Sequence, residues 1–215
     1  MGLSFHTISS TGSNAAIIHY EPTKEKSSIV SKDKVYLIDS GAQYLDGTTD
    51  TTRTCHFGTP NKTEKEMYTR VLLGNLAIER VKMSKVSGLT GGSIDPLARQ
   101  FLWHANVDYM HGTGHGVGYY LNVHEGPHGI GGYPGNPPLT PGMVMSNEPG
   151  YYLKDDFGIR IENVIFVKEL ESDKNVICFE NLTIVPYENN LLDMDLLSND
   201  TLNFINEYHQ RVNSY

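Results

Sequence analysis

The chain has 215 residues, of which 39% are apolar and 20% are charged, a composition typical of a globular protein with a substantial core. Its 17 basic and 25 acidic side chains give a formal net charge of -8, which argues against nucleic acids and anionic membranes as partners, because both favour a basic surface. The two cysteines, Cys55 and Cys178, lack CxxC spacing, so we expect no disulfide framework and a cytoplasmic location.

The chain opens on "LSFHTISSTGSNAAIIHY", residues 3–20, which reads as a strand and a loop with no helix before it. The first ten residues lack the apolar core of a signal peptide, and no apolar run approaches the length of a membrane span. We therefore expect a chain that begins partway through a fold.

Helical periodicity predicts three helices, over residues 63–82, 95–107 and 199–212. Thr63 and Glu66 stand at the spacing of a capping box, and Asp95 is the expected N-cap of the second helix, with a proline at its first helical position. The expected apolar stripes are Met67, Val71, Leu72 and Leu76 in the first helix, Leu97, Phe101 and Ala105 in the second, and Leu202, Ile205, Tyr208 and Val212 in the third.

Strand-like runs cover residues 34–44, 51–58, 142–153, 157–167 and 181–187. The turn sequences "LDGT" and "KDDFG" join neighbouring runs, and "GYPGNPPLTPG" reads as a surface loop. Strands and helices do not alternate strictly, so we expect an α+β fold with a largely antiparallel sheet.

Two aspartates form the first candidate pair. Asp39 lies in an apolar strand, where an ionised carboxylate is costly unless it is paired or bound to a metal. Asp50 follows 11 positions later on the returning strand, so a hairpin can bring the two together, although the sequence leaves their register open. The alternative is that Asp39 caps a strand and Asp50 belongs to a polar turn.

Two glutamates repeat the same design. Glu148 and Glu162 flank the "KDDFG" turn at a separation of 14. If that turn is centred near Asp155 and Asp156, the glutamates fall almost opposite each other across the ladder. Two carboxylates so close repel strongly in a dry site, which indicates a cation between them.

A glycine-rich segment, "YMHGTGHGVGYYLNVHEGP", carries three histidines, His111, His115 and His124. Its glycines disfavour a regular helix, so His111 and His115 are not a helical zinc pair. Glycine instead permits a close backbone approach to metal ions and leaves a cleft for substrate. We expect His124, on the strand-like run that follows, to face the same cleft.

Four carboxylates and His115 make a donor set dominated by hard oxygen atoms. Such a set suits two divalent ions such as Mn²⁺ better than a structural zinc ion. The positive charges of two divalent ions also balance the negative charges of four carboxylates. A hydroxide bridging the two ions would be the nucleophile of a hydrolytic reaction.

Other residues carry weaker signals. His19 follows an apolar run, a position more typical of a core histidine. Arg53 and Arg160 lie beside the acidic residues, where they are either surface charges or partners of metal-binding carboxylates. Cys55 lies in a predicted strand and is interpreted as a packing residue.

These motifs resemble the catalytic domain of the metallopeptidases with the pita-bread fold, and within them the cytosolic eukaryotic aminopeptidase P, or Xaa-Pro aminopeptidase, type. The segments that carry the resemblance are "STGSNAAIIHY", "LIDSGAQYLDGTTDTTRT", "GTGHGVGYYLNVHEGP", "NEPGYY" and "GIRIEN", which run in family order from about residue 3 to residue 185. The resemblance implies a curved, mostly antiparallel sheet with flanking helices. Family members carry further helices and domains ahead of this region, so we expect residues 1–215 to form an N-terminally truncated catalytic domain.

The resemblance also implies roles for individual residues. The five implied metal ligands are Asp39, Asp50, His115, Glu148 and Glu162, with Asp50 and Glu162 bridging two ions, most typically Mn²⁺ with Co²⁺ or Zn²⁺ as alternatives. His19, His115 and His124 fall on substrate-binding positions, and His19, His124 and Glu148 on catalytic ones. Glu148 would handle the proton and His124 would stabilise the oxyanion. Arg160 is similar to the arginine that orients the Glu162 carboxylate.

The implied function is removal of the N-terminal residue before a penultimate proline, with peptides as substrates and a homodimer as the state of full-length members. A prolidase, which takes only dipeptides, shares the ligands and is the nearest alternative. Methionine aminopeptidase shares the fold, but its surrounding motifs match less well. A non-catalytic pita-bread binding module is the third alternative, although such relatives typically lose ligands that are all present here.

Overall fold

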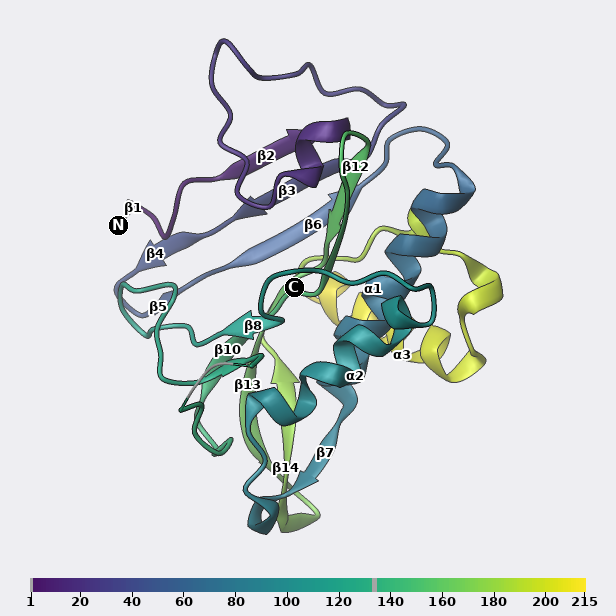
Figure 1. Cartoon of the computed structure of the whole chain (residues 1–215). Helices are drawn as coiled ribbons and strands as arrows, with labels where there is room; N and C mark the ends of the chain where they lie inside the picture. Colours follow the sequence, from purple (N-terminus) through teal and green to yellow (C-terminus); the bar gives the residue numbers. More distant parts are fainter. Residues whose placement is uncertain (1, 133–134) are drawn as a thin grey trace.

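The computed structural model of the chain describes residues 2–132 and 135–215 (Figure 1). Its helices are α1 (Lys62–Arg80), α2 (Gly91–Trp103) and α3 (Asn199–Asn213). Figure 1 shows the helices together on one side of the molecule, beside an upper and a lower group of strands. This mixture of helices and antiparallel sheets confirms the expected α+β class.

The described strands form one four-stranded sheet, two three-stranded sheets and two two-stranded sheets. The upper sheet has the order β2 (Ile8–Thr11), β3 (Tyr36–Ser40), β6 (Thr51–Cys55), and beside it runs β1 (Gly2–Leu3), β4 (Ala42–Tyr44), β5 (Gly47–Thr48). The lower sheet has the order β10 (Val144–Asn147), β13 (Asn163–Leu170), β14 (Asp173–Asn181), β7 (Lys82–Ser84). The remaining pairs are β8 (Gly114–His115) with β9 (Gly129–Ile130), and β11 (Gly150–Leu153) with β12 (Phe157–Arg160). All these strand pairs are antiparallel, as expected.

The capping box of helix α1 lies two residues before the predicted one. The Asn61 side chain accepts from the Glu64 backbone N–H, and the Glu64 carboxylate accepts from the Asn61 backbone N–H. Thr63 and Glu66 are therefore already inside the helix, and Glu66 pairs with Arg70 one turn later. The correction follows from cap preference, because asparagine is among the strongest N-cap residues.

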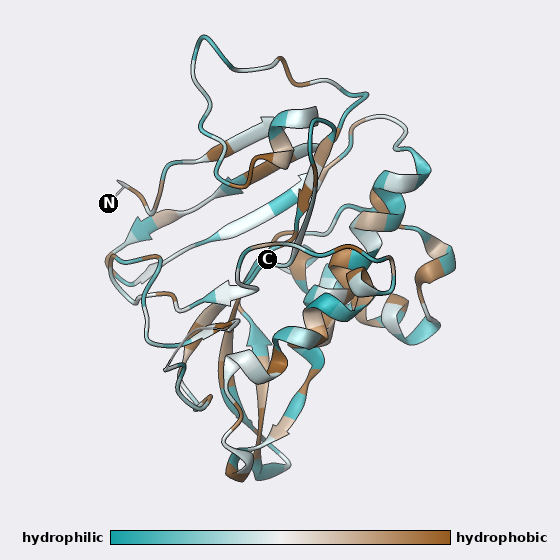
Figure 2. Ribbon diagram, in the orientation of Figure 1, coloured by the Kyte–Doolittle hydropathy of each residue, from teal (hydrophilic) through white to brown (hydrophobic). Residues whose placement is uncertain are grey.

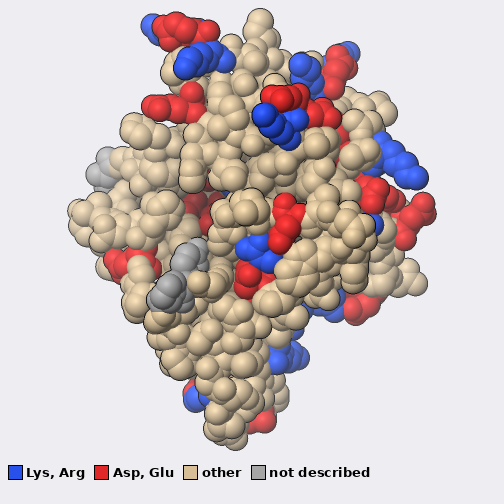
Figure 3. Space-filling model, viewed as in Figure 1, with Lys and Arg blue, Asp and Glu red and all other residues tan. Residues whose placement is uncertain are grey.

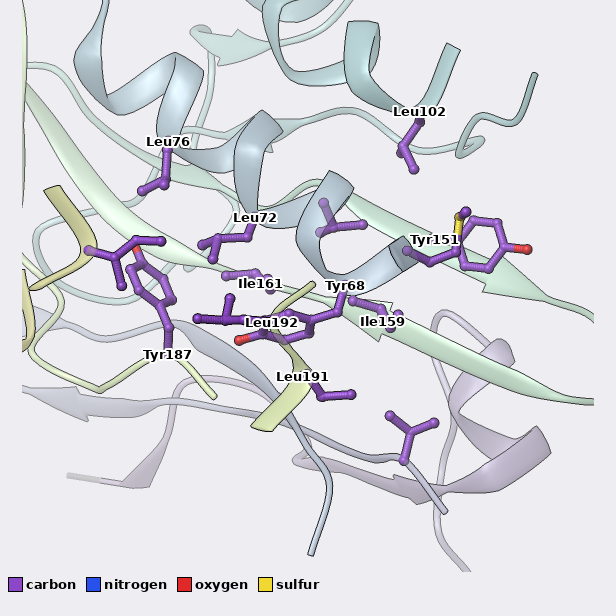
Figure 4. Packing of buried hydrophobic residues seen from close by; sticks show 14 of the residues in the cluster. Tyr68, Leu72, Leu76, Leu102, Tyr151, Ile159, Ile161, Tyr187, Leu191 and Leu192 are labelled. Atoms are coloured by element: carbon purple, nitrogen blue, oxygen red, sulfur yellow. The ribbon is translucent and has the colours of Figure 1, made fainter. Parts of the chain in front are cut away.

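The apolar face of α1 lies at the centre of the main core, where Tyr68 and Leu72 are fully buried (Figure 4). The expected stripe of this helix is confirmed: Met67, Val71, Leu72 and Leu76 are all buried. In Figure 4, side chains from β11, β12 and the segment before α3 surround this face. On α3, Ile205 and Tyr208 face the core as predicted, but Thr201 rather than Leu202 is buried.

Helix α2 starts earlier than predicted and buries a different face. Its capping box joins Thr90 and Ser93, so the expected N-cap Asp95 lies within the helix. Its buried side chains are Ile94, Ala98 and Leu102, whereas Leu97, Phe101 and Ala105 are only partly buried. The first helical residue is Gly91, where a Cβ would lie 1.8 Å from the Gly129 carbonyl oxygen. The absence of a side chain at Gly91 thus lets α2 pack closely against β9.

The expected strand over residues 181–187 is wrong beyond its first residue. Strand β14 ends at Asn181, and the carbonyl oxygens that follow accept from side chains: Tyr208 donates to Thr183 and Val185, and Arg53 donates to Val185 and Pro186. These backbone groups are satisfied without a ladder. Gly41 similarly divides the expected strand 34–44 into β3 and β4.

Hydrophilic and hydrophobic residues alternate around the helices (Figure 2), as expected for helices that cover a core on one side. On the face seen in Figure 3, acidic and basic side chains lie in small mixed groups, around the edge and near the centre. Within the described ranges, none of the helices combines the length and apolarity that a membrane crossing requires. Residues 133–134 of the predicted Pro/Gly-rich loop lie outside the described residues.

Candidate metal centre and active site

Strands β3 and β6 bring the two aspartates to one face of the upper sheet. Asp39 pairs with Thr52 in the ladder, and Asp50 precedes Thr52 by two residues. Asp50 is therefore a diagonal neighbour of Asp39 on the same face. Both residues are buried, with exposed fractions of 8% for Asp39 and 4% for Asp50, and both line one cavity. This register fixes the relative positions of Asp39 and Asp50, which the sequence left open.

The two glutamates lie opposite each other in a gap between two ladders. Gly150 pairs with Arg160 in the β11–β12 hairpin, and Asn147 pairs with Asn163 between β10 and β13. The two ladders share one register, which places Glu148 across from Glu162, as the turn-centred prediction had it. Asp155, in the connecting turn, adopts a left-handed φ of 63°, a conformation that aspartate tolerates better than most residues.

His115, on β8, lies between the two pairs of carboxylates. Its Nε2 is 3.4 Å from Asp50 Oδ2 and 3.3 Å from Glu148 Oε1. Its Nδ1 lies 2.9 Å from the Gly116 carbonyl oxygen. A proton on Nδ1 that is donated to this oxygen leaves the Nε2 lone pair directed at the carboxylates, the usual arrangement of a metal-binding histidine.

The glycines around His115 allow a close approach of two backbones. A Cβ on Gly114 would lie 1.9 Å from the Ser146 carbonyl oxygen. The Ser146 hydroxyl accepts from the His115 backbone N–H and donates to Glu148 Oε1 at 2.9 Å. Ser146 thus holds the backbone of one candidate ligand and the carboxylate of another.

The donor set fits a pair of divalent cations. Donor atoms of Asp50, His115 and Glu162 all lie within 4.8 Å of one another. Burial raises the pKa of Glu162 well above its usual range, and the neighbouring carboxylates of Asp50, Glu148 and Asp39 raise it further. Burial likewise raises the pKa of Glu148 to about 7 against the opposing effect of His115. Divalent cations bound among these carboxylates would favour their ionised forms.

Asp39 adds a second sign of the same fit. Its Oδ1 is buried and has no hydrogen-bond partner in the described part of the chain, while its Oδ2 accepts from Arg160 at 2.7 Å. A buried carboxylate oxygen without a donor is costly unless a cation is coordinated there. All five predicted ligand residues line the same cavity: Asp39, Asp50, His115, Glu148 and Glu162.

Arg160 differs from the expectation that it orients Glu162 directly. Its carboxylate partner is Asp39, and its Nε donates to Thr52 Oγ1 at 3.1 Å. The Thr52 hydroxyl in turn donates to Glu162 Oε2 at 2.7 Å. Arg160 therefore reaches Glu162 only through Thr52. Arg53 donates to the backbone carbonyl of Glu162 rather than to any carboxylate of the set.

His19 and His124 also line the cavity. The rings of His115 and His124 meet edge to face, with centroids 4.3 Å apart. Burial lowers the pKa of His124, and the neighbouring His115 lowers it further. The segment around His124 is a loop rather than the expected strand, because Leu121 and Asn122 both have left-handed φ angles.

His111 lines the cavity, a role that the sequence analysis did not assign to it. His111 Nε2 lies 2.9 Å from the Tyr152 hydroxyl, which accepts from Arg160 at 2.9 Å. Burial lowers the pKa of His111 to about 4, so its ring is neutral near pH 7. The chain Arg160–Tyr152–His111 therefore joins β12 and β11 to the glycine-rich segment. Thr52 and Ser146 were missed as well, since a hydroxyl residue in a strand carries no distinctive signal.

The cavity has a volume of about 490 Å³. Acidic side chains lie at the bottom of a hollow left of centre on the face in Figure 3. Its size suits a short peptide segment, and its polar groups converge on one side as in ligand sites generally. Geometry, charge and donor chemistry together define a candidate metal site.

Comparison with known proteins gives the class. The chain belongs to metallopeptidase family M24: residues 1–169 match the family itself, and residues 175–215 match the C-terminal region described for peptidases of this family. The fold is the pita-bread fold expected from the motifs.

Similarity to individual relatives narrows the comparison from the family to particular peptidases. The chain is 57% identical, over 99% of its length and 36% of the relative's, to a probable Xaa-Pro aminopeptidase P from Leptosphaeria maculans. It superimposes with a TM-score of 0.93 and 44% identity, over 98% of this chain and 34% of the other, on X-prolyl aminopeptidase from Caenorhabditis elegans, described as a cytosolic enzyme with a di-nuclear active site. A prolidase from Pyrococcus horikoshii OT3 gives a TM-score of 0.73 and 32% identity over 86% of this chain and 49% of that one. The chain thus spans about a third of the length of its Xaa-Pro aminopeptidase relatives.

Proposed function

We propose that residues 1–215 form the catalytic domain of a metal-dependent exopeptidase that hydrolyses the bond between an N-terminal residue and a penultimate proline. The observation that carries the proposal is the convergence of Asp39, Asp50, His115, Glu148 and Glu162 on one cavity. The similarity to Xaa-Pro aminopeptidases over almost the whole chain supports the choice of substrate.

We assign the five converging residues as ligands of two divalent ions, with Asp50 and Glu162 shared between them. Mn²⁺ is the proposed metal, because the donors are mostly carboxylate oxygens. When bound, the two ions would acidify a water molecule so that it becomes a nucleophile, and they would supply a positive field for the scissile carbonyl.

The chain's own residues then carry the proton and position the substrate. Glu148 accepts the proton of the attacking water and passes it to the proline nitrogen as that bond breaks. Ser146 orients the Glu148 carboxylate through the hydrogen bond to Oε1. His124 donates to the carbonyl oxygen as negative charge develops on it, and His19 holds the peptide against the same wall. His115 belongs to both sets, as a ligand and as part of the surface that the substrate contacts.

A prolidase activity is the second candidate, supported by the structural similarity to prolidases. The two activities differ in whether a residue after the proline is accepted. We further propose a cytoplasmic enzyme, in line with the description of the nematode relative, and a homodimer for the full-length protein.

The test is a hydrolysis assay with the purified chain in added Mn²⁺. Arg-Pro-Pro and Ala-Pro-Ala measure aminopeptidase activity, Ala-Pro measures prolidase activity, and Ala-Ala-Ala is the matched control without proline. We expect cleavage of the two tripeptides that contain proline and little cleavage of the control. Cleavage of the control alone would contradict the proposal, and cleavage of Ala-Pro alone would establish the prolidase alternative. A chain that retains no Mn²⁺ after saturation and gel filtration would favour a non-catalytic binding module.

A further inference from the structure

One carboxylate on the cavity wall has no place in the metal centre. Glu21 follows the turn that holds His19, and it lines the cavity together with its neighbours Ile18, His19 and Tyr20.

The Glu21 carboxylate is also without a partner of its own. In residues 2–132 and 135–215 it makes neither a side-chain hydrogen bond nor an ion pair, and the residue is exposed. The other acidic groups of the cavity are engaged: Asp39 with Arg160, Asp50 and Glu148 beside His115, and Glu162 with Thr52. Glu21 is thus the negative charge of this cavity that neither the proposed metal ions nor Arg160 balances.

Three apolar residues, Phe5, Ile8 and Ile18, line the cavity together with Glu21. A lysine or arginine side chain matches this surface, because its methylene stem packs on apolar groups while its charged end reaches a carboxylate. A neutral side chain would gain the apolar contact alone.

We infer that Glu21 is a specificity-determining residue, which binds a cationic group of the peptide and favours substrates with lysine or arginine next to the scissile bond. The inference rests on the proposed function, from which it takes the reaction. It concerns how the peptide binds, and measurements of peptide binding therefore test it. The free N-terminal amine is the other source of the same ammonium chemistry, and the test separates the two.

The probes are four peptides whose scissile carbonyl is a thioamide, which resists hydrolysis: Lys-Pro-Ala with Nle-Pro-Ala, and Ala-Pro-Lys with Ala-Pro-Nle. Norleucine keeps the stem of lysine without its charge.

Dissociation constants are measured by calorimetry on the Mn²⁺-loaded chain, on Glu21→Gln and on Glu25→Gln. Glu25→Gln is the control, because the exposed Glu25 carboxylate lies in the same segment but does not line the cavity. In one pair we expect lysine to bind about fivefold more tightly than norleucine, equivalent to about 1 kcal/mol. Glu21→Gln should abolish this preference, and Glu25→Gln should retain it.

The other outcomes are equally informative. If Glu21→Gln weakens all four peptides by the same factor and Glu21→Asp restores part of the loss, the cation bound is the N-terminal amine. Equal lysine-to-norleucine ratios in wild type and Glu21→Gln, with no uniform loss, would overturn the inference. So would a uniform loss that Glu21→Asp does not rescue. The amide forms are assayed for hydrolysis in parallel, so a lysine preference without any cleavage would refute the proposed function and leave the role of Glu21 standing.

Discussion

Arg160 Nη2 lies 2.7 Å from Asp39 Oδ2, and this ion pair connects β12 to β3 inside the protein. The two residues are only 2% and 8% exposed. Arg160 also donates to Thr52 and to Tyr152, so one guanidinium contacts both hairpins that supply the acidic residues. The relative position of the two hairpins therefore depends on this side chain.

Replacing Arg160 by methionine should lower the free energy of unfolding of the metal-free chain by about 3–5 kcal/mol, because it leaves Asp39 buried without its cation. Urea denaturation followed by circular dichroism measures the change. Arg80→Met is the matched control, since Arg80 forms an exposed ion pair with Asp200, and its loss should cost less than about 1 kcal/mol. Equal losses for the two variants would show that the buried pair has no special importance.

Asp50→Asn should abolish binding of two metal ions and activity while the domain stays folded. Asparagine keeps the shape of the side chain but removes the charge that faces His115 and Glu162. Metal content after dialysis against Mn²⁺, measured by atomic absorption, is the readout. Asp46→Asn, in the exposed turn of the same hairpin, should bind metal as wild type does. Two equivalents retained by Asp50→Asn would remove Asp50 from the ligand set.

His124→Ala should retain both metal ions and lose about 10²- to 10³-fold in kcat, the size of the effect of one oxyanion donor. The physical reason is position, because His124 lies in an exposed loop against the ring of His115 rather than among the carboxylates. Metal content and steady-state rates on the same preparation check both parts. His104→Ala, at the end of α2, is the control; loss of metal from His124→Ala would make His124 a ligand.

Glu79→Gln should change how stability depends on pH. Burial raises the pKa of Glu79 from 4.5 to about 7, although Asn181 donates to its carboxylate. The folded chain thus holds a proton that the unfolded chain releases near pH 4.5, so wild-type stability falls as pH rises from about 4.5 to 7. Glutamine cannot ionise, and the variant should gain about 1–2 kcal/mol on wild type between pH 5 and pH 8.

Chemical denaturation at a series of pH values tests this expectation. Glu207→Gln serves as the control, because Glu207 is exposed on α3 and no comparable change is expected there. Parallel pH profiles for wild type and Glu79→Gln would contradict the prediction.

Two of the four acidic residues of the candidate site stand out in the sequence because each interrupts an apolar pattern. Asp39 and Glu162 interrupt apolar strands, and the turn before β12 sets the position of Glu148 opposite Glu162. The convergence of the two hairpins could not be derived in this way, since it depends on tertiary contacts such as the Arg160–Asp39 pair. The motif resemblance supplied what local pattern could not.

The misses have a common physical cause in long-range contacts. The segment after Asn181 has the composition of a strand, yet its carbonyl groups accept from Arg53 and Tyr208, residues more than 20 positions away. The predicted start of α2 is too late, because the periodicity of apolar residues carries no information about the close approach of Gly91 to β9. Thr52 and Ser146 acquire their importance only from the neighbours that the fold brings to them.

The turn Lys154–Asp156 acts as a spacer, because the two ladders that flank Glu148 and Glu162 share one register. Removing a single residue from this turn would shift β12 by one position and point Glu162 away from the cavity, since side chains alternate along a strand. Exchanging Asp155 for glycine would keep the left-handed backbone and the length. The composition of this short surface loop can therefore change, whereas an inserted or deleted residue would displace a proposed metal ligand.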